Sequence, residues 1–418
     1  MDILLKSAKI VDLKNKDLHL KKRDIHIKNG KIEKIGSNLN VDKKTKVISR
    51  KNLHVSLGWF DTGVSFGEPG YEERETIANG LFTAGKSGFT DVVLNPSSSP
   101  APDSSSAIVF LKNAAKNEVT ALHPLGTVTL KGEGEHLAEL FDMKNAGAVA
   151  FSDYKEPVKN SNLLKIALQY SQNFEGLVYS FPMDDKIAGK GIVNEGPNST
   201  RLGLKGIPAL AEELQIARDL YILQYTGGKL HIPTISTTGS VKLIAQAKKK
   251  GLDVTSSVAV HNLWFTDDEL HEFDTTYKTM PPLRQKNDIL SLRKGLKDGT
   301  VDFVTTDHSP MNVEEKRIEF DNAGYGTIGL ESAFGILNQI FDLETVIHLL
   351  TKGRERFGVD SSTIEKGQKA NLTLFDPTST NTLKLENLTS TSKNAAFLKI
   401  TMKGSVLGII CNNKTLLS

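Results

Sequence analysis

Residues 54–70 read HVSLGWFDTGVSFGEPG, an apolar run that passes directly into a polar, glycine-containing loop. Such a run is typical of a strand that is buried on both faces, as in parallel sheets covered by helices. In a closed parallel barrel, the loops that follow the strands form the active-site face. The stretch therefore predicts a barrel strand that ends at a pocket, with Asp61, Gly63 and Ser65 at its mouth.

The same arrangement recurs along residues 55–355, where apolar runs alternate with amphipathic segments. The further runs are FTDVVLN (89–95), GAVAFSD (147–153), GLVYSF (176–181), KLHIPTI (229–235), LDVTSSVA (252–259) and VDFVTTD (301–307). The segments between them have helical periodicity and end near Gly or Asn, as helices commonly do. Strand followed by helix, repeated about eight times, predicts an α/β fold, a (β/α)₈ TIM barrel.

Residues 1–54 and 356–418 have a different pattern, with short β-type runs joined by tight turns such as Asn29-Gly30. Asn-Gly between two such runs is a strong signal for a β-hairpin. Because both strand-rich ends flank the helical middle, we expect one small composite β-domain, a β-sandwich, formed by both termini.

The composition limits the classes of partner. The 418 residues include 52 Lys or Arg and 49 Asp or Glu, which gives a net charge of +3. This near balance argues against nucleic acid or an anionic membrane as a partner. The single cysteine rules out an internal disulfide, and no apolar run reaches the roughly 18 residues of a membrane span. The N-terminus is too polar for a secretory signal, so we expect a cytoplasmic protein.

The residues that follow the predicted strands are poor in metal ligands. A hydrolytic zinc site in a barrel needs several converging N or O ligands, usually with more than one imidazole. Asp153 and Asp307 are the carboxylates at these positions. Two carboxylates would hold a hard cation weakly and suit a hydroxide-generating zinc poorly.

The polar residues at the strand ends also have purely structural interpretations. Asp307 could cap its loop or pair with a neighbouring Lys or Arg. His231 and His261 are predicted to be core histidines bonded to the backbone, and Cys411 to pack as a small hydrophobe. The sequence has no P-loop, G-x-S-x-G or H-E-x-x-H motif, and GKSG at 85–88 is predicted to be a helix end.

Blocks along nearly the whole chain resemble a known family. They are EPGYEERETIANGLFTAGKSGFTDVVLNPSSSP, GAVAFSDYKEPV, IVNEGPNSTRLGLKGIPALAEELQIARD, YKTMPPLRQKNDILSLRKGLKDGTVDFVTTDHSP, IGLESAF and EKGQKANLTLFDP. In order and content they are similar to dihydroorotases of the amidohydrolase superfamily, in the bacterial class that works alongside aspartate transcarbamoylase. PPLR, DHSP and NEG…RLGL favour dihydroorotase over allantoinase and dihydropyrimidinase. The resemblance implies an amidohydrolase-type barrel and a place in pyrimidine biosynthesis.

The resemblance also implies where the family's site residues would fall, and most of them are replaced. The family's D-x-H-x-H-x-R signature supplies two zinc-ligating histidines and an arginine for the substrate carboxylate. The family's metal positions are here Gly63, Ser65, Asp153, Ser180, Thr234 and Asp307. Its substrate positions are here Gly67, Ser97, Met280 and Met311, while Asp307 remains as a vestige of the catalytic general acid/base. Since Gly, Ser and Thr bind zinc poorly, we expect no cofactor, although active members hold zinc.

Three functions follow as hypotheses. The first is a catalytically inactive dihydroorotase homologue that acts as a structural partner of aspartate transcarbamoylase, as inactive members of the family do. The second is an active cyclic amidohydrolase that converts dihydroorotate to N-carbamoyl-aspartate with a non-standard metal site or with none. The third is a self-assembling structural protein, and a homo-oligomer is compatible with all three. The emptied pocket could also bind a regulatory ligand between Glu68, Arg201, Asp307 and His308.

Overall fold

The computed structural model describes residues 1–360 and 363–418, and eight parallel strands among them form a barrel. The strands are β6 (Trp59–Val64), β7 (Phe89–Leu94), β8 (Ala121–Gly126), β9 (Ala150–Phe151), β10 (Leu177–Tyr179), β13 (Lys229–Ile232), β14 (Val254–Ala259) and β15 (Phe303–Thr305). They follow the order β15-β14-β13-β10-β9-β8-β7-β6. The predicted (β/α)₈ TIM barrel is confirmed.

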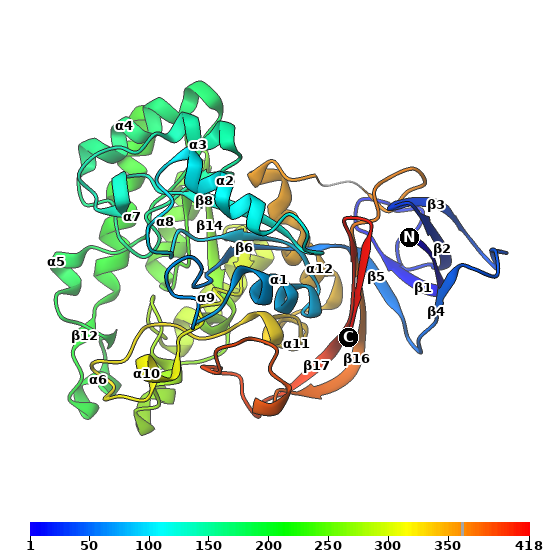
Figure 1. Ribbon diagram of the computed structural model, residues 1–418. Coiled ribbons are helices and arrows are strands. Elements are labelled where there is room, and N and C mark those ends of the chain that lie inside the picture. Colours follow the sequence, from blue (N-terminus) through cyan, green and yellow to red (C-terminus); the bar gives the residue numbers. More distant parts are fainter. Residues whose placement is uncertain (361–362) are drawn as a thin grey trace.

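Helices pack around the outside of this barrel (Figure 1). The longer ones are α1 (Ile77–Lys86), α2 (Ser105–Ala114), α3 (Leu140–Ala146), α4 (Ser161–Ser171), α7 (Ala209–Thr226), α8 (Thr238–Lys249), α9 (Lys286–Asp298), α11 (Leu330–Ile340) and α12 (Leu343–Thr351). Shorter pieces are α5 (Asp185–Ala188), α6 (Pro197–Leu202), α10 (Val313–Lys316) and the 3₁₀ segments η3 (Val260–Leu263) and η6 (Lys352–Phe357). The predicted helix end at GKSG is confirmed, because α1 ends at Lys86. No helix in the described ranges is both long and apolar enough to cross a membrane.

The barrel closes between its first and last strands mainly through side chains. Val64 and His308 form a single parallel bridge. The buried carboxylate of Asp61 accepts hydrogen bonds from the Thr305 hydroxyl at 2.8 Å and from the Thr306 backbone N–H at 3.2 Å. Because a buried carboxylate needs such donors, Asp61 holds β6 and β15 together.

Strand β8 is not predicted by the sequence pattern. Its residues ALHPLG contain Pro124, which lacks a backbone donor, and His123, which interrupts the apolar run. In the structure, β8 pairs in parallel with both β7 and β9. Pairing with two neighbouring strands therefore overrides a weak local signal.

Both ends of the chain form a second, mixed sheet beside the barrel, and both termini lie on this side of the molecule (Figure 1). Its strands are β1 (Asp2–Val11), β2 (Lys22–Lys28), β3 (Lys31–Gly36), β4 (Lys46–Ile48), β5 (His54–Leu57), β16 (Leu372–Thr382), β17 (Thr401–Cys411) and β18 (Lys414–Leu417). The order is β18-β17-β16-β5-β1-β2-β3, with β4 paired to β1. The predicted β-domain built from both termini is confirmed, and its strands form one mixed sheet.

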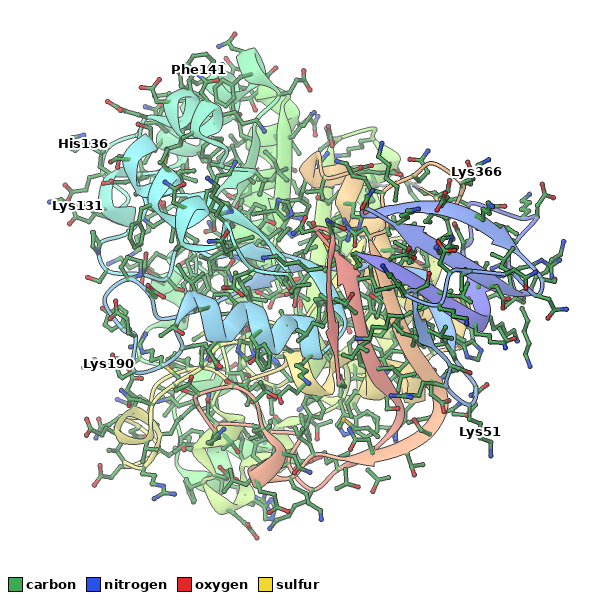
Figure 2. The ribbon with its side chains drawn as sticks, turned by 45° about the vertical axis from the view of Figure 1, so that its right-hand side comes forward. Lys51, Lys131, His136, Phe141, Lys190 and Lys366 are labelled. Atoms are coloured by element: carbon green, nitrogen blue, oxygen red, sulfur yellow. The ribbon has the colours of Figure 1, made fainter. Side chains whose placement is uncertain are left out.

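The Asn29-Gly30 turn joins β2 to β3, and both residues have positive φ angles, 49° and 75°. This is the backbone that a tight Asn-Gly hairpin requires. By contrast, β4 and β5 pair with β1 in parallel, which the hairpin pattern does not predict. Figure 2 shows Lys51 and Lys366 in loops of this sheet, on the side of the molecule away from Lys131 and Lys190.

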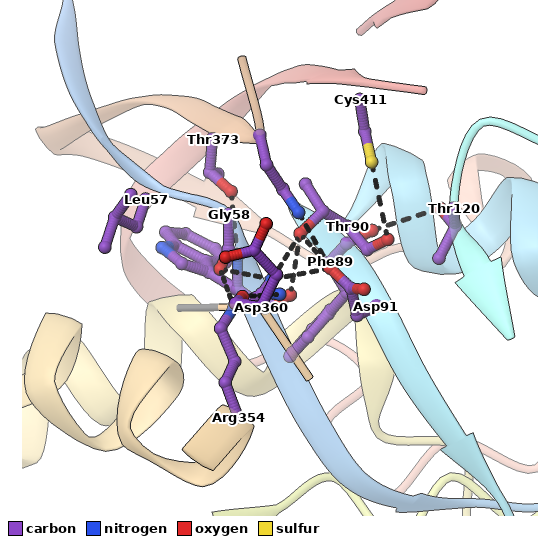
Figure 3. A network of polar contacts seen from close by, with 12 residues as sticks. Leu57, Gly58, Phe89, Thr90, Asp91, Thr120, Arg354, Asp360, Thr373 and Cys411 are labelled. Atoms are coloured by element: carbon purple, nitrogen blue, oxygen red, sulfur yellow. Dashed lines mark hydrogen bonds and ion pairs between the residues drawn. The ribbon is translucent and has the colours of Figure 1, made fainter. Parts of the chain in front are cut away.

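A buried network around Arg354 of η6 joins the amino-terminal end of the barrel to the terminal sheet (Figure 3). The guanidinium donates to the Gly58 carbonyl at 2.9 Å and to the Asp91 carboxylate at 2.5 Å. Asn371, directly before β16, donates to the same carboxylate at 3.1 Å. Burial alone would raise the pKa of Asp91, but Arg354 holds it below its ordinary value. The network is therefore an ionised pair that fixes the two parts of the chain to each other.

Replacing Arg354 by Met should destabilise the fold by about 3–5 kcal/mol, because Asp91 would stay buried without the guanidinium, with His123 left beside it as an ion-pair partner. The free energy of unfolding from urea titration measures this loss. The matched control is Lys159→Met, whose exposed pair with Asp185 should contribute less than about 1 kcal/mol. Equal stability of the Arg354→Met variant and the wild type would contradict this account.

Candidate functional site

The carboxyl ends of the barrel strands enclose an inner cavity of about 20 Å³. Three of the six family metal positions line it, namely Gly63, Thr234 and Asp307. The other three lie outside its lining: Ser65, Asp153 and Ser180. A buried water needs about 10–15 Å³ of such space, so the cavity has room for about one water and none for a ring-sized substrate.

Lys155, just beyond β9, places its ammonium in this cavity beside Asp307. Lys155 Nζ lies 3.2 Å from Asp307 Oδ2, and the two side chains are 16% and 5% exposed. Burial lowers the pKa of the lysine, but Asp307 and Tyr154 together outweigh burial and raise the pKa above its ordinary value. Burial also raises the pKa of Asp307, and Lys155 opposes that rise. Of the structural interpretations of Asp307, pairing with a lysine is confirmed.

Tyr154 forms the wall between the inner cavity and a wider outer pocket of about 380 Å³, since it lines both. Its hydroxyl accepts a hydrogen bond from the Ser65 hydroxyl at 2.9 Å and lies 3.3 Å from the Ser309 hydroxyl. Asn95 donates to Ser65 at 3.3 Å. Ser65, at a family metal position, therefore helps to hold the tyrosine across the mouth.

The carboxylate of Asp153 is engaged by the loop that follows β8. One oxygen accepts from the backbone N–H groups of Val128 and Thr129 at 2.8 and 3.0 Å, and the other accepts from the Thr129 hydroxyl at 2.7 Å. Burial raises the pKa of Asp153, and these hydrogen bonds oppose the rise. This family ligand position acts here as a loop cap.

The remaining family metal positions are part of the barrel wall. The Ser180 hydroxyl is buried and donates to Asp219 of α7 at 2.6 Å. The Thr234 backbone N–H donates to the Ser257 hydroxyl at 3.2 Å. Neither side chain offers a nitrogen or a carboxylate to the cavity.

Gly67, at the family's arginine position, lies in a tight loop. Its N–H donates to the Glu75 carbonyl and its own carbonyl accepts from the Tyr71 N–H, both at 2.8 Å. A Cβ atom at residue 67 would lie 1.7 Å from the Tyr71 carbonyl oxygen. The loop therefore excludes any side chain at this position.

Two of the other three substrate positions share one pocket. Ser97 and Met311 line the outer pocket with Ser65 and Asp153, whereas Asp307 lines the inner cavity. Met280 packs against the apolar cluster around Phe181. The structure brings none of the three beside the family's general acid/base position.

The residues present do not fit a zinc ion. Among the residues that the structure describes, no group of three or more His, Cys, Asp or Glu side chains could hold a metal. Asp307 is paired with Lys155, and Asp153 is bonded to the loop after β8. The hydroxyls and amides that remain bind zinc poorly.

The histidines near the strand ends lie in the core. Burial lowers the pKa of His231 well below its ordinary value and that of His261 to about 3, so both are neutral. The predicted bonds to backbone are wrong. His231 lies 2.9 and 3.1 Å from the hydroxyls of Thr255 and Ser257 on the adjacent strand β14, and His261 Nε2 has no partner in the described part of the chain. Cys411 is buried as predicted, which raises its pKa to about 12.

The four residues proposed for a regulatory pocket do not come together, so that prediction is wrong. Glu68 accepts from the first backbone N–H of α1 at 2.8 Å, and Arg201 bonds within α6. His308 is fully buried, with Nε2 3.5 Å from Glu75. Of the four, Asp307 lines the inner cavity.

Comparison with known proteins places this barrel in a family. Residues 54–240 match the family model described as dihydro-orotase-like. A dihydroorotase from Pelotomaculum thermopropionicum is 37% identical over 416 residues, which cover 97% of this chain and 96% of that protein. A dihydroorotase from Geotalea daltonii is 35% identical over 422 residues, with 99% of each chain covered. The chain belongs to the dihydroorotase family.

Solved structures support the fold of this dihydroorotase-like chain. The L-hydantoinase (dihydropyrimidinase) from Arthrobacter aurescens matches with a TM-score of 0.86 at 19% identity, covering 100% of this chain and 96% of that one. The D-hydantoinase from Thermus sp. matches with a TM-score of 0.83 at 18% identity, covering 99% and 95%. At these identities the likeness shows the amidohydrolase fold alone.

Family blocks that this dihydroorotase-like chain retains have a structural use. Arg284 of PPLR is buried and donates to the Ser236 hydroxyl at 3.0 Å, the Asn194 side chain at 2.9 Å and the Ile207 carbonyl at 2.7 Å. Asn194 belongs to the NEG block. These blocks therefore hold the loops above the barrel in place without any metal.

Sequence reasoning missed Tyr154 and Lys155, which directly follow Asp153. The signal that could have found them is charge balance. A buried carboxylate such as Asp307 needs either hydrogen-bond donors or a counter-charge, and a cationic side chain near another strand end is a candidate for that counter-charge. Lys155 is such a residue.

Introducing Ala at Gly67 should destabilise the protein by at least about 3 kcal/mol, because its Cβ would meet backbone that cannot move freely. The matched control is Gly63→Ala, where the nearest atoms would be 3.5 Å away, an ordinary contact. We expect that control to change stability by less than about 1 kcal/mol. Urea unfolding of both variants tests the comparison, and similar losses in both would contradict it.

Stability at low pH should depend on Glu75. Burial alone would raise its pKa, but His308 and further hydrogen-bond donors lower it to about 2. Because this folded value lies below the unfolded one, the contribution is present above about pH 4.5 and is lost as the pH falls towards 2, about 3 kcal/mol in all. In the Glu75→Gln variant, the melting temperature should fall less steeply than in the wild type as the pH drops from about 4.5 towards 2. Glu272→Gln, with a side chain 79% exposed, is the control and should keep the wild-type slope.

Proposed function

We propose that this dihydroorotase-like chain is catalytically inactive and serves pyrimidine biosynthesis as a structural partner of aspartate transcarbamoylase. The observation that carries the proposal is the engagement of both carboxylates at family metal positions. Asp307 is paired with Lys155, and Asp153 is bonded to the loop after β8. The other metal positions carry only Gly, Ser or Thr.

The geometry of the barrel mouth supports the loss of chemistry. Hydrolysis of a cyclic amide needs an activated water and stabilisation of the charge that develops on the carbonyl oxygen, and a metal ion supplies both in metal-dependent hydrolases. The inner cavity has room for about one water. Asp307 lines the inner cavity and not the outer pocket, so a substrate held in the outer pocket would not contact the general acid/base position.

The partner role is supported by what remains intact. The Arg354 network and the Arg284 contacts give a fixed framework, and a rigid surface can bind a partner without any catalytic group. The identity of the partner rests on the resemblance alone, which implies the bacterial dihydroorotase class that works alongside aspartate transcarbamoylase.

Metal analysis and an activity assay test the catalytic half of the proposal. The chain purified without chelators at neutral pH should contain far less than one zinc per chain. Neither dihydroorotate hydrolysis nor N-carbamoyl-aspartate cyclisation should exceed the rate in buffer, with or without added zinc. Stoichiometric zinc together with zinc-dependent turnover would establish an active enzyme instead.

Co-purification tests the other half in the same preparation. The tagged chain, captured from its native lysate, should elute in size exclusion together with transcarbamoylase activity. An exposed substitution in the terminal sheet, Lys51→Ala, provides a control for handling and should leave co-elution unchanged. Elution of the chain purely as a homo-oligomer would favour the self-assembling hypothesis.

A further inference from the structure

The inner cavity contains one positive charge that the chain itself supplies. Gly63, Thr234 and Asp307, three family metal positions, line it together with Lys155. Lys155 Nζ lies 3.2 Å from Asp307 Oδ2 and 5.3 Å from the centre of the Tyr154 ring. Lys155 therefore lines the same cavity as these three metal positions, with its ammonium beside Asp307.

We infer that the Lys155 ammonium is a built-in substitute for a metal ion, a tethered cation that neutralises Asp307 and, with Tyr154 as a plug, closes the barrel mouth. This inference deepens the proposed function and rests on it, because a catalytic metal would need the space that the ammonium takes. The inference also names a ligand for this site: without the lysine side chain, the site should bind a primary alkylammonium ion.

Charge balance is the first argument. Asp307 is 95% buried, and burying an ionised carboxylate is costly unless hydrogen-bond donors or a cation satisfy it. Asp61 and Asp153 have hydroxyl and backbone donors, whereas Asp307 has the Lys155 ammonium. With no imidazoles at the family positions, a metal would have few ligands and would readily dissociate. A lysine is attached to the chain and cannot leave, so it neutralises the carboxylate at any metal concentration.

Two other buried charged groups near the barrel mouth are engaged elsewhere. Asp153 caps the loop after β8. Lys316, a second buried lysine, donates to the carbonyls of Thr275 and Gly324, both at 2.7 Å. Lys155 is thus the cation whose position matches Asp307.

The backbone around the cavity is a second, independent argument. Tyr154, Thr234 and Asp307 all line it, and their φ angles are 58°, 47° and 42°. Positive φ is uncommon for residues other than glycine and is rarest for β-branched ones such as Thr. Strained residues of this kind persist where surrounding contacts hold them. The Lys155–Asp307 pair and the bond from Ser65 to Tyr154 are contacts of that kind.

Removal of the ammonium tests the inference. Lys155→Ala deletes three carbons and the amine, so n-propylammonium replaces the missing atoms. The variant should melt roughly 5 °C below the wild type, and about 50 mM n-propylammonium should recover at least half of that loss. Tetramethylammonium at equal ionic strength, too bulky and without N–H donors, should recover none. The wild type and the exposed control Lys131→Ala should respond to neither ion.

The carboxylate must be the group that the added ion meets. In the double variant Lys155→Ala/Asp307→Asn, n-propylammonium should have no effect on the melting temperature. Recovery of the same size in the double variant, or with tetramethylammonium, would overturn the inference, as would a Lys155→Ala variant that melts within about 1 °C of the wild type.

A double-mutant cycle covers the case in which Lys155→Ala does not fold. Lys155→Met and Asp307→Asn should each lower the melting temperature, and the double variant should lose clearly less than the two losses combined. Additive losses would overturn the inference. Turnover is not among these measurements, so zinc-dependent activity would refute the proposed function, whereas additive losses would refute only the built-in cation.

Discussion

The carboxylate of Asp61 is the contact on which the barrel mouth depends. It is buried at the junction of β6 and β15, where the backbone ladder is reduced to the Val64–His308 bridge. Hydrogen bonds from Thr305 and Thr306 hold it there, and an ionised carboxylate without them would be costly to bury. Since β6 carries Gly63 and leads into Ser65, and β15 leads into Asp307, this junction decides which residues can meet in the cavity.

The cavity shows how carboxylates at the family metal positions are satisfied by the chain itself. Carboxylates that remain after imidazoles are lost become buried charges in need of partners. In this chain they find them in two ways, Asp153 through backbone and hydroxyl donors and Asp307 through an ammonium. The replacements Gly63 and Thr234 add no charge of their own. Both carboxylates at the barrel mouth thus have partners within the chain itself. This is consistent with a protein that keeps its shape without performing hydrolysis.

The framework is separable from the chemistry because different residues carry each. Arg354 ties the barrel to the terminal sheet, and Arg284 ties together the loops above it. Neither touches the inner cavity. This explains how blocks typical of the dihydroorotase family can be present in a chain whose metal positions are replaced. Similarity in such blocks therefore predicts the fold, whereas the few residues at the strand ends determine the chemistry.

The sequence by itself determined the alternation of strands and helices, the Asn29-Gly30 hairpin and the scarcity of ligands at the strand ends, because periodicity, turn chemistry and residue type are local properties. Only the tertiary structure decided that β8 is a strand, since its pairing comes from two neighbours. It also decided that Lys155 meets Asp307. These residues are 152 positions apart, and the direction of each side chain is set by the closed barrel and not by its own stretch of chain.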